Sequence, residues 1–131
     1  MNNSLDRTGL CQTDTDFAPA ARDSAEAVRA LHQTLRAEPH VEHILNAMPM
    51  LVMLLNAHRQ IVAVNQRVLE AVGADHSAVL GKRPGELVGC VHAADAPGGC
   101  GTGDPCRVCG AVEAILQTQA QHRPCSRECR I

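Results

Sequence analysis

The chain has 131 residues, of which 45% are hydrophobic, and a formal net charge of −2 at pH 7. This length holds one domain of ordinary size with a short extension, and the near-neutral charge gives no electrostatic reason to expect nucleic acid or a membrane as a partner. The sequence has no Trp or Tyr and a single Phe, so we expect an aliphatic core.

The sequence contains neither a membrane span nor a secretory signal. Its longest apolar run, residues 48–55, is interrupted by Pro49 and is too short to cross a bilayer. The first twenty residues lack the basic and apolar regions of a signal peptide. The expected location is therefore cytoplasmic, where clustered cysteines indicate metal or redox chemistry more often than disulfides.

Residues 1–20 are polar and without periodicity, which predicts a disordered leader. Residues 21–38 form an expected amphipathic helix, with Val28, Leu31 and Leu35 on one narrow stripe. That stripe has two interpretations: it packs on the chain's own domain, or it pairs with a second copy in a homodimer.

Residues 40–131 read as one α+β domain. A short helix is expected over residues 40–48, and Pro49 ends it because proline disfavours helix in the residue before it. Residues 50–56 and 61–65 are rich in aliphatic or β-branched residues and predict two strands. Strands joined by so short a connection must be antiparallel.

The remainder of this domain is expected to be mainly helical. Residues 66–73 predict a helix that Gly73 caps, and residues 75–89 predict one or two short helices. Residues 110–121 predict a longer helix with Val112, Ile115 and Leu116 inward. Residues 125–131 are expected to begin a strand.

A family resemblance joins these elements. The stretch "ILNAMPMLVMLLNAHRQIVAVNQRVLEAVGA" resembles the opening of a PAS sensory domain, and Asn65 stands where an Asn usually ends the second PAS strand. The stretch "GKRPGELVGCVHAADAPGGCGTGDPCRVCGAVEAIL" and the closing "ECRI" resemble a cysteine-rich PAS subgroup found ahead of bacterial histidine kinases. The resemblance covers residues 41–131.

The resemblance implies a PAS-like antiparallel sheet with flanking short helices. It also implies a sensory role in signal transduction, a histidine kinase or other output protein as partner, and a homodimer. A complete PAS sheet has two more strands than this sequence predicts, so we expect an incomplete sheet whose open edge favours self-association. No nucleophile–base pair or phosphate loop stands out, so an enzyme is not expected.

Six cysteines lie within forty residues, around a glycine-rich loop at residues 90–109. Their spacing is Cys90-x9-Cys100-x5-Cys106-x2-Cys109-x15-Cys125-x3-Cys129. The Cys106-x-x-Cys109 pair allows both thiolates to reach one centre, and the start of the following helix favours a thiolate at Cys109. Cys11 stands apart and is expected to be a bystander.

Two metal chemistries fit this spacing. An iron–sulfur cluster tolerates irregular spacing and suits Cys90, Cys100, Cys106 and Cys109, with Cys129 as a substitute ligand. A structural zinc site prefers two short-spaced pairs, which Cys106/Cys109 and Cys125/Cys129 nearly supply. The cluster suits a module that senses redox state or a gas, and zinc suits an interaction module without sensing. His92 is a further candidate to replace one thiolate.

Overall fold

The computed structural model describes residues 15–131, which divide into two compact units. The core unit is Arg22–Val88, and the cysteine unit is residues 15–21 together with Gly89–Ile131. Within the described residues, no helix combines the length and the apolar character that crossing a membrane requires.

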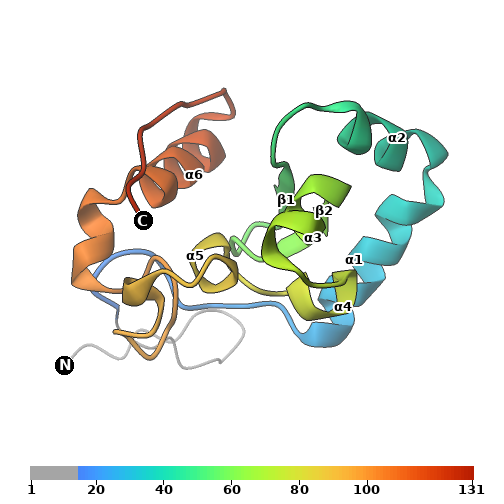
Figure 1. Ribbon diagram of the computed structural model, residues 1–131. Helices are drawn as coiled ribbons and strands as arrows, with labels where there is room; N and C mark the ends of the chain where they lie inside the picture. The colour runs from blue at the N-terminus through green and yellow to red at the C-terminus, as the bar shows by residue number, and fades with distance from the viewer. Residues whose placement is uncertain (1–14) are drawn as a thin grey trace. The chain divides into compact units, whose positions relative to one another are not determined.

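The core unit consists of short helices around a two-stranded sheet (Figure 1). Its elements in chain order are α1 (Ala25–Ala37), α2 (Pro39–Ala47), β1 (Met53–Leu55), β2 (Ile61–Val64), α3 (Gln66–Val72), α4 (His76–Val79) and α5 (Pro84–Leu87). The cysteine unit contains two 3-10 helices, η1 (Val91–Ala93) and η2 (Asp104–Val108), followed by α6 (Gly110–Gln121). This mixture of helices and an antiparallel sheet confirms the α+β class.

The strands β1 and β2 are antiparallel, as their short connection requires. Met53 lies opposite Val64, and the register shifts between Leu54 and Leu55. All four residues of β2 are buried, as in a strand covered on both faces. The central hydrophobic cluster is made of Ile61, Val64, Val68, Leu69 and Val79.

Helix α3 begins and ends at the residues that the sequence indicates. The Asn65 side chain accepts a hydrogen bond from the Val68 N–H and caps the first turn. Gly73 caps the last turn in the left-handed conformation, with φ of +64°. The prediction of a helix ended by Gly73 is therefore confirmed.

Helix α1 packs against β2, which supports packing on its own domain. Val28 and His32, one turn apart, are its buried residues, and the His32 Nδ1–H donates to the Val62 carbonyl at 2.8 Å. Leu31, on the same predicted stripe as Val28, is 39% exposed. The sheet therefore covers a face of α1 that includes Val28 and His32 and leaves Leu31 outside it.

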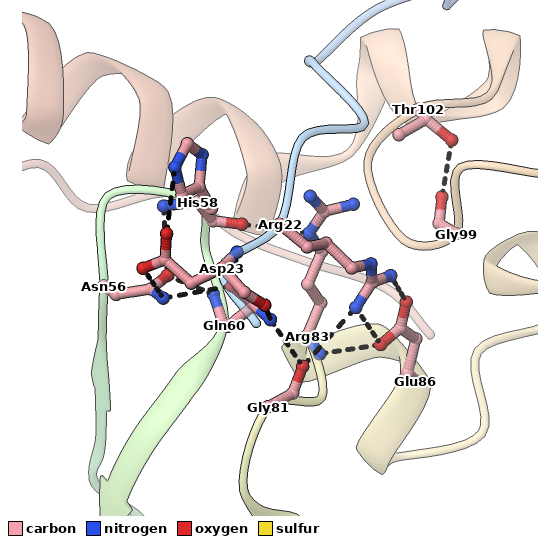
Figure 2. Close-up of polar contacts among 10 residues, drawn as sticks. All are labelled: Arg22, Asp23, Asn56, His58, Gln60, Gly81, Arg83, Glu86, Gly99 and Thr102. Carbon is pink, nitrogen blue, oxygen red and sulfur yellow. Dashed lines mark hydrogen bonds and ion pairs between the residues drawn. The ribbon is translucent and has the colours of Figure 1, made fainter. Parts of the chain in front are cut away.

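A buried polar network joins the residues before α1 to the β1–β2 turn and to α5 (Figure 2). Gln60 accepts from the Asp23 N–H at 2.8 Å and from the Asn56 side chain at 3.1 Å. Arg83 is fully buried, and its Nε donates to the His58 carbonyl at 3.0 Å. The network satisfies polar groups that would otherwise be costly to bury.

The predicted C-terminal strand is absent. Residues 125–131 have no regular secondary structure, and the described part of the chain has a single two-stranded sheet. These residues, here called the terminal segment, contact α6 instead of a strand. β-propensity in so short a stretch produces a strand only where a partner strand offers backbone hydrogen bonds.

His76 gives the core unit a predicted pH dependence. Its ring centroid lies 5.4 Å from that of His32, and among residues 15–131 its buried Nδ1 has no hydrogen-bond partner. Burial lowers the pKa of His76 below its ordinary value of 6.5; His32 and Arg36 lower it further, while Glu42 and Asp75 oppose the shift. Protonation is therefore easier in the unfolded chain than in the folded one.

The free energy of unfolding should consequently fall as the pH drops below 6.5, and the loss is complete below the folded-state pKa. Above 6.5 both states are neutral at His76 and the effect vanishes. Urea unfolding between about pH 7.5 and about pH 5 should show a shallower pH dependence in His76→Gln than in the wild type. Equal slopes in the two proteins would contradict the prediction.

Candidate functional site

All six cysteines described by the structure lie in the cysteine unit. Cys106 is buried at 5% exposure, and the other five are half-buried. Cys11 lies outside the described residues, so its expected bystander role has no structural description. The residues that the sequence singles out therefore share one compact unit.

The glycine-rich loop is held by backbone hydrogen bonds. Gly99 and Gly101 have φ of +84° and +88°, a conformation that other residues rarely adopt. The Thr102 hydroxyl donates to the Gly99 carbonyl at 2.7 Å, as Figure 2 shows. The N–H groups of Asp16 and Ala18 donate to the Thr102 and Gly101 carbonyls at 3.0 and 2.9 Å. Residues 16 and 18, part of the expected leader, thus hold the loop.

The Cys106-x-x-Cys109 motif connects η2 to α6. Cys106 lies inside η2, and Cys109 is the N-cap residue of α6. The Cys109 N–H donates to the Cys106 carbonyl at 3.1 Å. The predicted position of Cys109 at the start of this helix is confirmed, and it places the thiol at the positive end of the helix dipole.

The terminal segment docks on one face of α6. Arg127 donates to Gln117 at 2.9 Å and pairs with Glu113 at 3.4 Å, and the Cys125 thiol donates to Gln117 at 3.0 Å. At Gly110, the first residue of α6, an added Cβ would lie 1.8 Å from the Glu128 carbonyl oxygen. Only a glycine therefore permits this close approach of two backbones.

This docking brings together two thiols that are twenty residues apart in sequence. The Sγ atoms of Cys109 and Cys129 are 3.8 Å apart. The Ala111 N–H, in the first turn of α6, also donates to the Cys129 sulfur. The pair is therefore located at the N-terminus of the helix, where one backbone N–H is directed at it.

The pKa of Cys129 is raised from its ordinary value of 9.0. The largest single influence, the hydrogen bond from the Ala111 N–H, lowers this pKa. Partial burial, the Cys109 hydrogen bond and the negative charges of Cys109 and Cys90 all raise the pKa, and together they outweigh the Ala111 effect. Cys90 is thus near enough to interact electrostatically with this pair. A positive ion among these sulfurs would reverse the repulsion and favour their thiolate forms.

The other candidate ligands do not complete a metal site with this pair. Within the described residues, no three cysteine, histidine or acidic side chains converge closely enough to hold a metal ion as they stand. Cys100 is half-buried in the glycine-rich loop. The imidazole of His92 is engaged instead by Asp95, at 2.8 Å.

The distance between the two sulfurs provides a test of metal fit. Two thiolates bound to one tetrahedral ion, each about 2.3 Å from it, lie about 3.8 Å apart. The observed Cys109–Cys129 separation is 3.8 Å. Tetrahedral coordination by two thiolates on one metal atom occurs in structural zinc sites and at each iron of a [2Fe–2S] cluster. The pair thus fits two ligands of a zinc ion or of one iron in a [2Fe–2S] cluster.

Sequence reasoning missed the residues that create this pairing. Gly110, Glu113 and Gln117 lie at i, i+3 and i+7 on α6 and together receive the terminal segment. Their spacing indicates that the three residues share one face of the helix. The sequence does not indicate which segment docks on that face.

Comparison of the chain with protein-family models, with curated proteins and with solved structures finds no match. The PAS resemblance and the function that it implies are therefore proposals.

Proposed function

We propose that this chain is a regulatory, sensory module in signal transduction. In this proposal it responds to redox state or a gas through an iron–sulfur cluster bound by cysteines of the cysteine unit. The observation that carries the proposal is the Cys109–Cys129 pair, whose sulfurs are 3.8 Å apart at the N-terminus of α6. Thiolates are the usual protein ligands of such clusters.

Cys109 and Cys129 are the two ligands already near each other. The remaining ligands come from Cys90, Cys100 and Cys106, so binding requires the glycine-rich loop to close toward the pair. The positive φ values of Gly99 and Gly101 favour a loop that follows a compact centre closely. A bound cluster would supply one-electron chemistry and sensitivity to oxygen or nitric oxide.

The terminal segment is the element that such a site would control. Its contacts with α6 are an ion pair between half-exposed side chains and a few hydrogen bonds, and ion pairs of this kind contribute only about 0–1 kcal/mol. Cys129 belongs to this segment, so losing a centre that it shares with Cys109 removes the strongest attachment. The segment is then held only by these weaker contacts and opens from α6 more readily, which changes the surface available to a partner.

The core unit supports a PAS-like fold within this proposal. Its order of helix, two antiparallel strands and short helices follows the PAS opening, and Asn65 occupies the end of the second strand. The proposed partner is a histidine kinase or another output protein in the cytoplasm, and a homodimer would use the exposed side of α1, where Leu31 lies. No catalytic role is proposed.

Anaerobic purification tests the cluster directly. The full chain, purified without oxygen, should contain iron and acid-labile sulfide and show visible absorption that bleaches in air. A colourless protein without iron after anaerobic reconstitution would overturn the cluster. That result would leave the fold of the core unit untouched.

Substitutions identify the ligands. Cys109→Ser and Cys129→Ser should each lose most of the bound iron, because each removes one of the two paired sulfurs. Cys125→Ser is the matched control: its thiol lies in the same segment but hydrogen-bonds Gln117, so iron content should remain near the wild-type value. Equal iron loss in all three variants would contradict the assignment.

A structural zinc site is the second candidate, and the sulfur separation favours it as well. Zinc does not change redox state, so this candidate describes an interaction module without sensing. Metal analysis after growth without added iron should then find about one zinc per chain, unaffected by air. Iron that displaces zinc on reconstitution would count against it.

A further inference from the structure

We propose that, in the metal-free chain, Cys109 and Cys129 form a reversible disulfide when a peroxide is the oxidant. This inference goes beyond the metal proposal because it assigns a covalent modification to the same two thiols. The supporting observation is the contact between the two sulfurs, which are 3.8 Å apart although the residues are twenty positions apart in sequence. To reach the S–S bond length of about 2.05 Å, the sulfurs must move together by less than the width of one atom.

The surroundings favour this pair over the other cysteines. Cys109 and Cys129 are both half-buried, so a small oxidant reaches them, whereas Cys106 is 5% exposed. The Cys125 thiol, four residues before Cys129, donates to Gln117 at 3.0 Å. Cys109 is also the N-cap residue of α6, so its sulfur meets that of Cys129 at the start of a twelve-residue helix.

The chemistry balances in two steps. The Cys109 thiolate attacks one peroxide oxygen and breaks the O–O bond, which gives a sulfenic acid on Cys109 and releases water once the leaving oxygen is protonated. The Cys129 sulfur then attacks the sulfenic sulfur, the S–O bond breaks, and a second water leaves. The two thiols lose two electrons, the peroxide gains them, and both thiol protons leave in the two waters.

The bond would fix the terminal segment to the start of α6. In the reduced chain this segment is held by the polar contacts of Arg127 and Cys125 and by the close approach of Glu128 to Gly110. A covalent link confines the segment even when those contacts open, because it limits the conformations of the intervening chain. Oxidation and metal binding would thus place the segment on the same side of α6.

Tryptic peptide mapping, combined with the Cys125→Ser variant, identifies the bond. Cleavage after Lys82, Arg107, Arg127 and Arg130 places Cys109 and Cys125 in residues 108–127 and Cys129 in residues 128–130, because trypsin does not cut before proline. Cys90, Cys100 and Cys106 fall in residues 83–107. A Cys109–Cys129 bond links the peptides 108–127 and 128–130, as a Cys125–Cys129 bond also would, and Cys125→Ser removes that alternative. A Cys106–Cys109 bond links 83–107 to 108–127 instead.

The experiment uses the full chain, which is first reduced and stripped of metal with a chelator. The protein is then treated with equimolar hydrogen peroxide, its remaining free thiols are blocked, and it is digested with trypsin. The link between 108–127 and 128–130 should be the dominant one and should disappear on reduction. Cys125→Ser should retain this link, and Cys129→Ser should lose it completely. A dominant link from 83–107, loss of the 108–127 to 128–130 link in Cys125→Ser, or no link at all would overturn the disulfide, whereas failure of the iron assay alone would overturn only the cluster.

Discussion

Replacing Gly110 with alanine is expected to detach the terminal segment from α6. The added Cβ would lie 1.8 Å from the Glu128 carbonyl oxygen and 2.8 Å from its carbonyl carbon, so two backbones must separate. The isolated helix would change in the opposite direction, because alanine favours a helix over glycine by about 0.5–1 kcal/mol. The steric clash therefore predicts that the terminal segment detaches, whereas helix propensity alone predicts a more stable α6.

Cross-linking of the two thiols measures the detachment. A short bifunctional thiol reagent should link Cys109 to Cys129 about tenfold or more slowly in Gly110→Ala than in the wild type, because reaction requires both sulfurs within reach. Gly103→Ala is the matched control, since its Cβ would lie 3.5 Å from that of Ala96, an ordinary contact. Equal rates in the wild type and Gly110→Ala would show that the close approach does not hold the segment.

Replacing Asn65 with alanine is expected to destabilise the core unit by about 3 kcal/mol or more. The Asn65 side chain is 1% exposed and accepts from the N–H groups of Val52 and Val68, at 3.2 and 3.4 Å. Its Nδ2 donates to the carbonyls of Leu45 and Met50, at 3.1 and 2.8 Å. One amide thus joins α2, the residues just before β1, and α3, and alanine removes all four of these hydrogen bonds.

Urea unfolding at neutral pH measures this loss. Asn46→Ala is the matched control, because the Asn46 side chain is exposed and accepts one hydrogen bond, from the Gln66 N–H at 2.8 Å. Its unfolding midpoint should shift only slightly, by an amount that corresponds to about 1 kcal/mol or less. Similar shifts for Asn46→Ala and Asn65→Ala would contradict the central role of Asn65.

Where a predicted boundary agrees with the structure, a residue at or next to that boundary causes it. Gly73 ends α3 because a left-handed cap costs glycine little, and Asn65 starts it because its side chain reaches back to the first turn. The antiparallel pairing of β1 and β2 follows from a connection too short for any crossover. Each cause acts within a few residues, so the sequence displays it.

The errors concern contacts between distant segments. Residues 125–131 were expected to begin a strand, but Arg127 and Cys125 attach them to a helix instead. On α1, no pattern in the sequence indicates that His32 rather than Leu31 is buried beside Val28, which follows from the Val62 carbonyl accepting its Nδ1–H. In both cases the partner lies far along the chain, and its position decides which side chains are covered.

The sequence by itself determined the α+β class, most helix boundaries, and the grouping of six cysteines around a glycine-rich loop, because propensity, capping and spacing are local properties. Only the tertiary structure decided that Cys109 meets Cys129, that Arg83 is fully buried within a polar network, and that Gly110 must be a glycine. The physical reason is the same for all three. Each depends on two backbones or side chains approaching within a few ångströms across many intervening residues, and no local pattern specifies that approach.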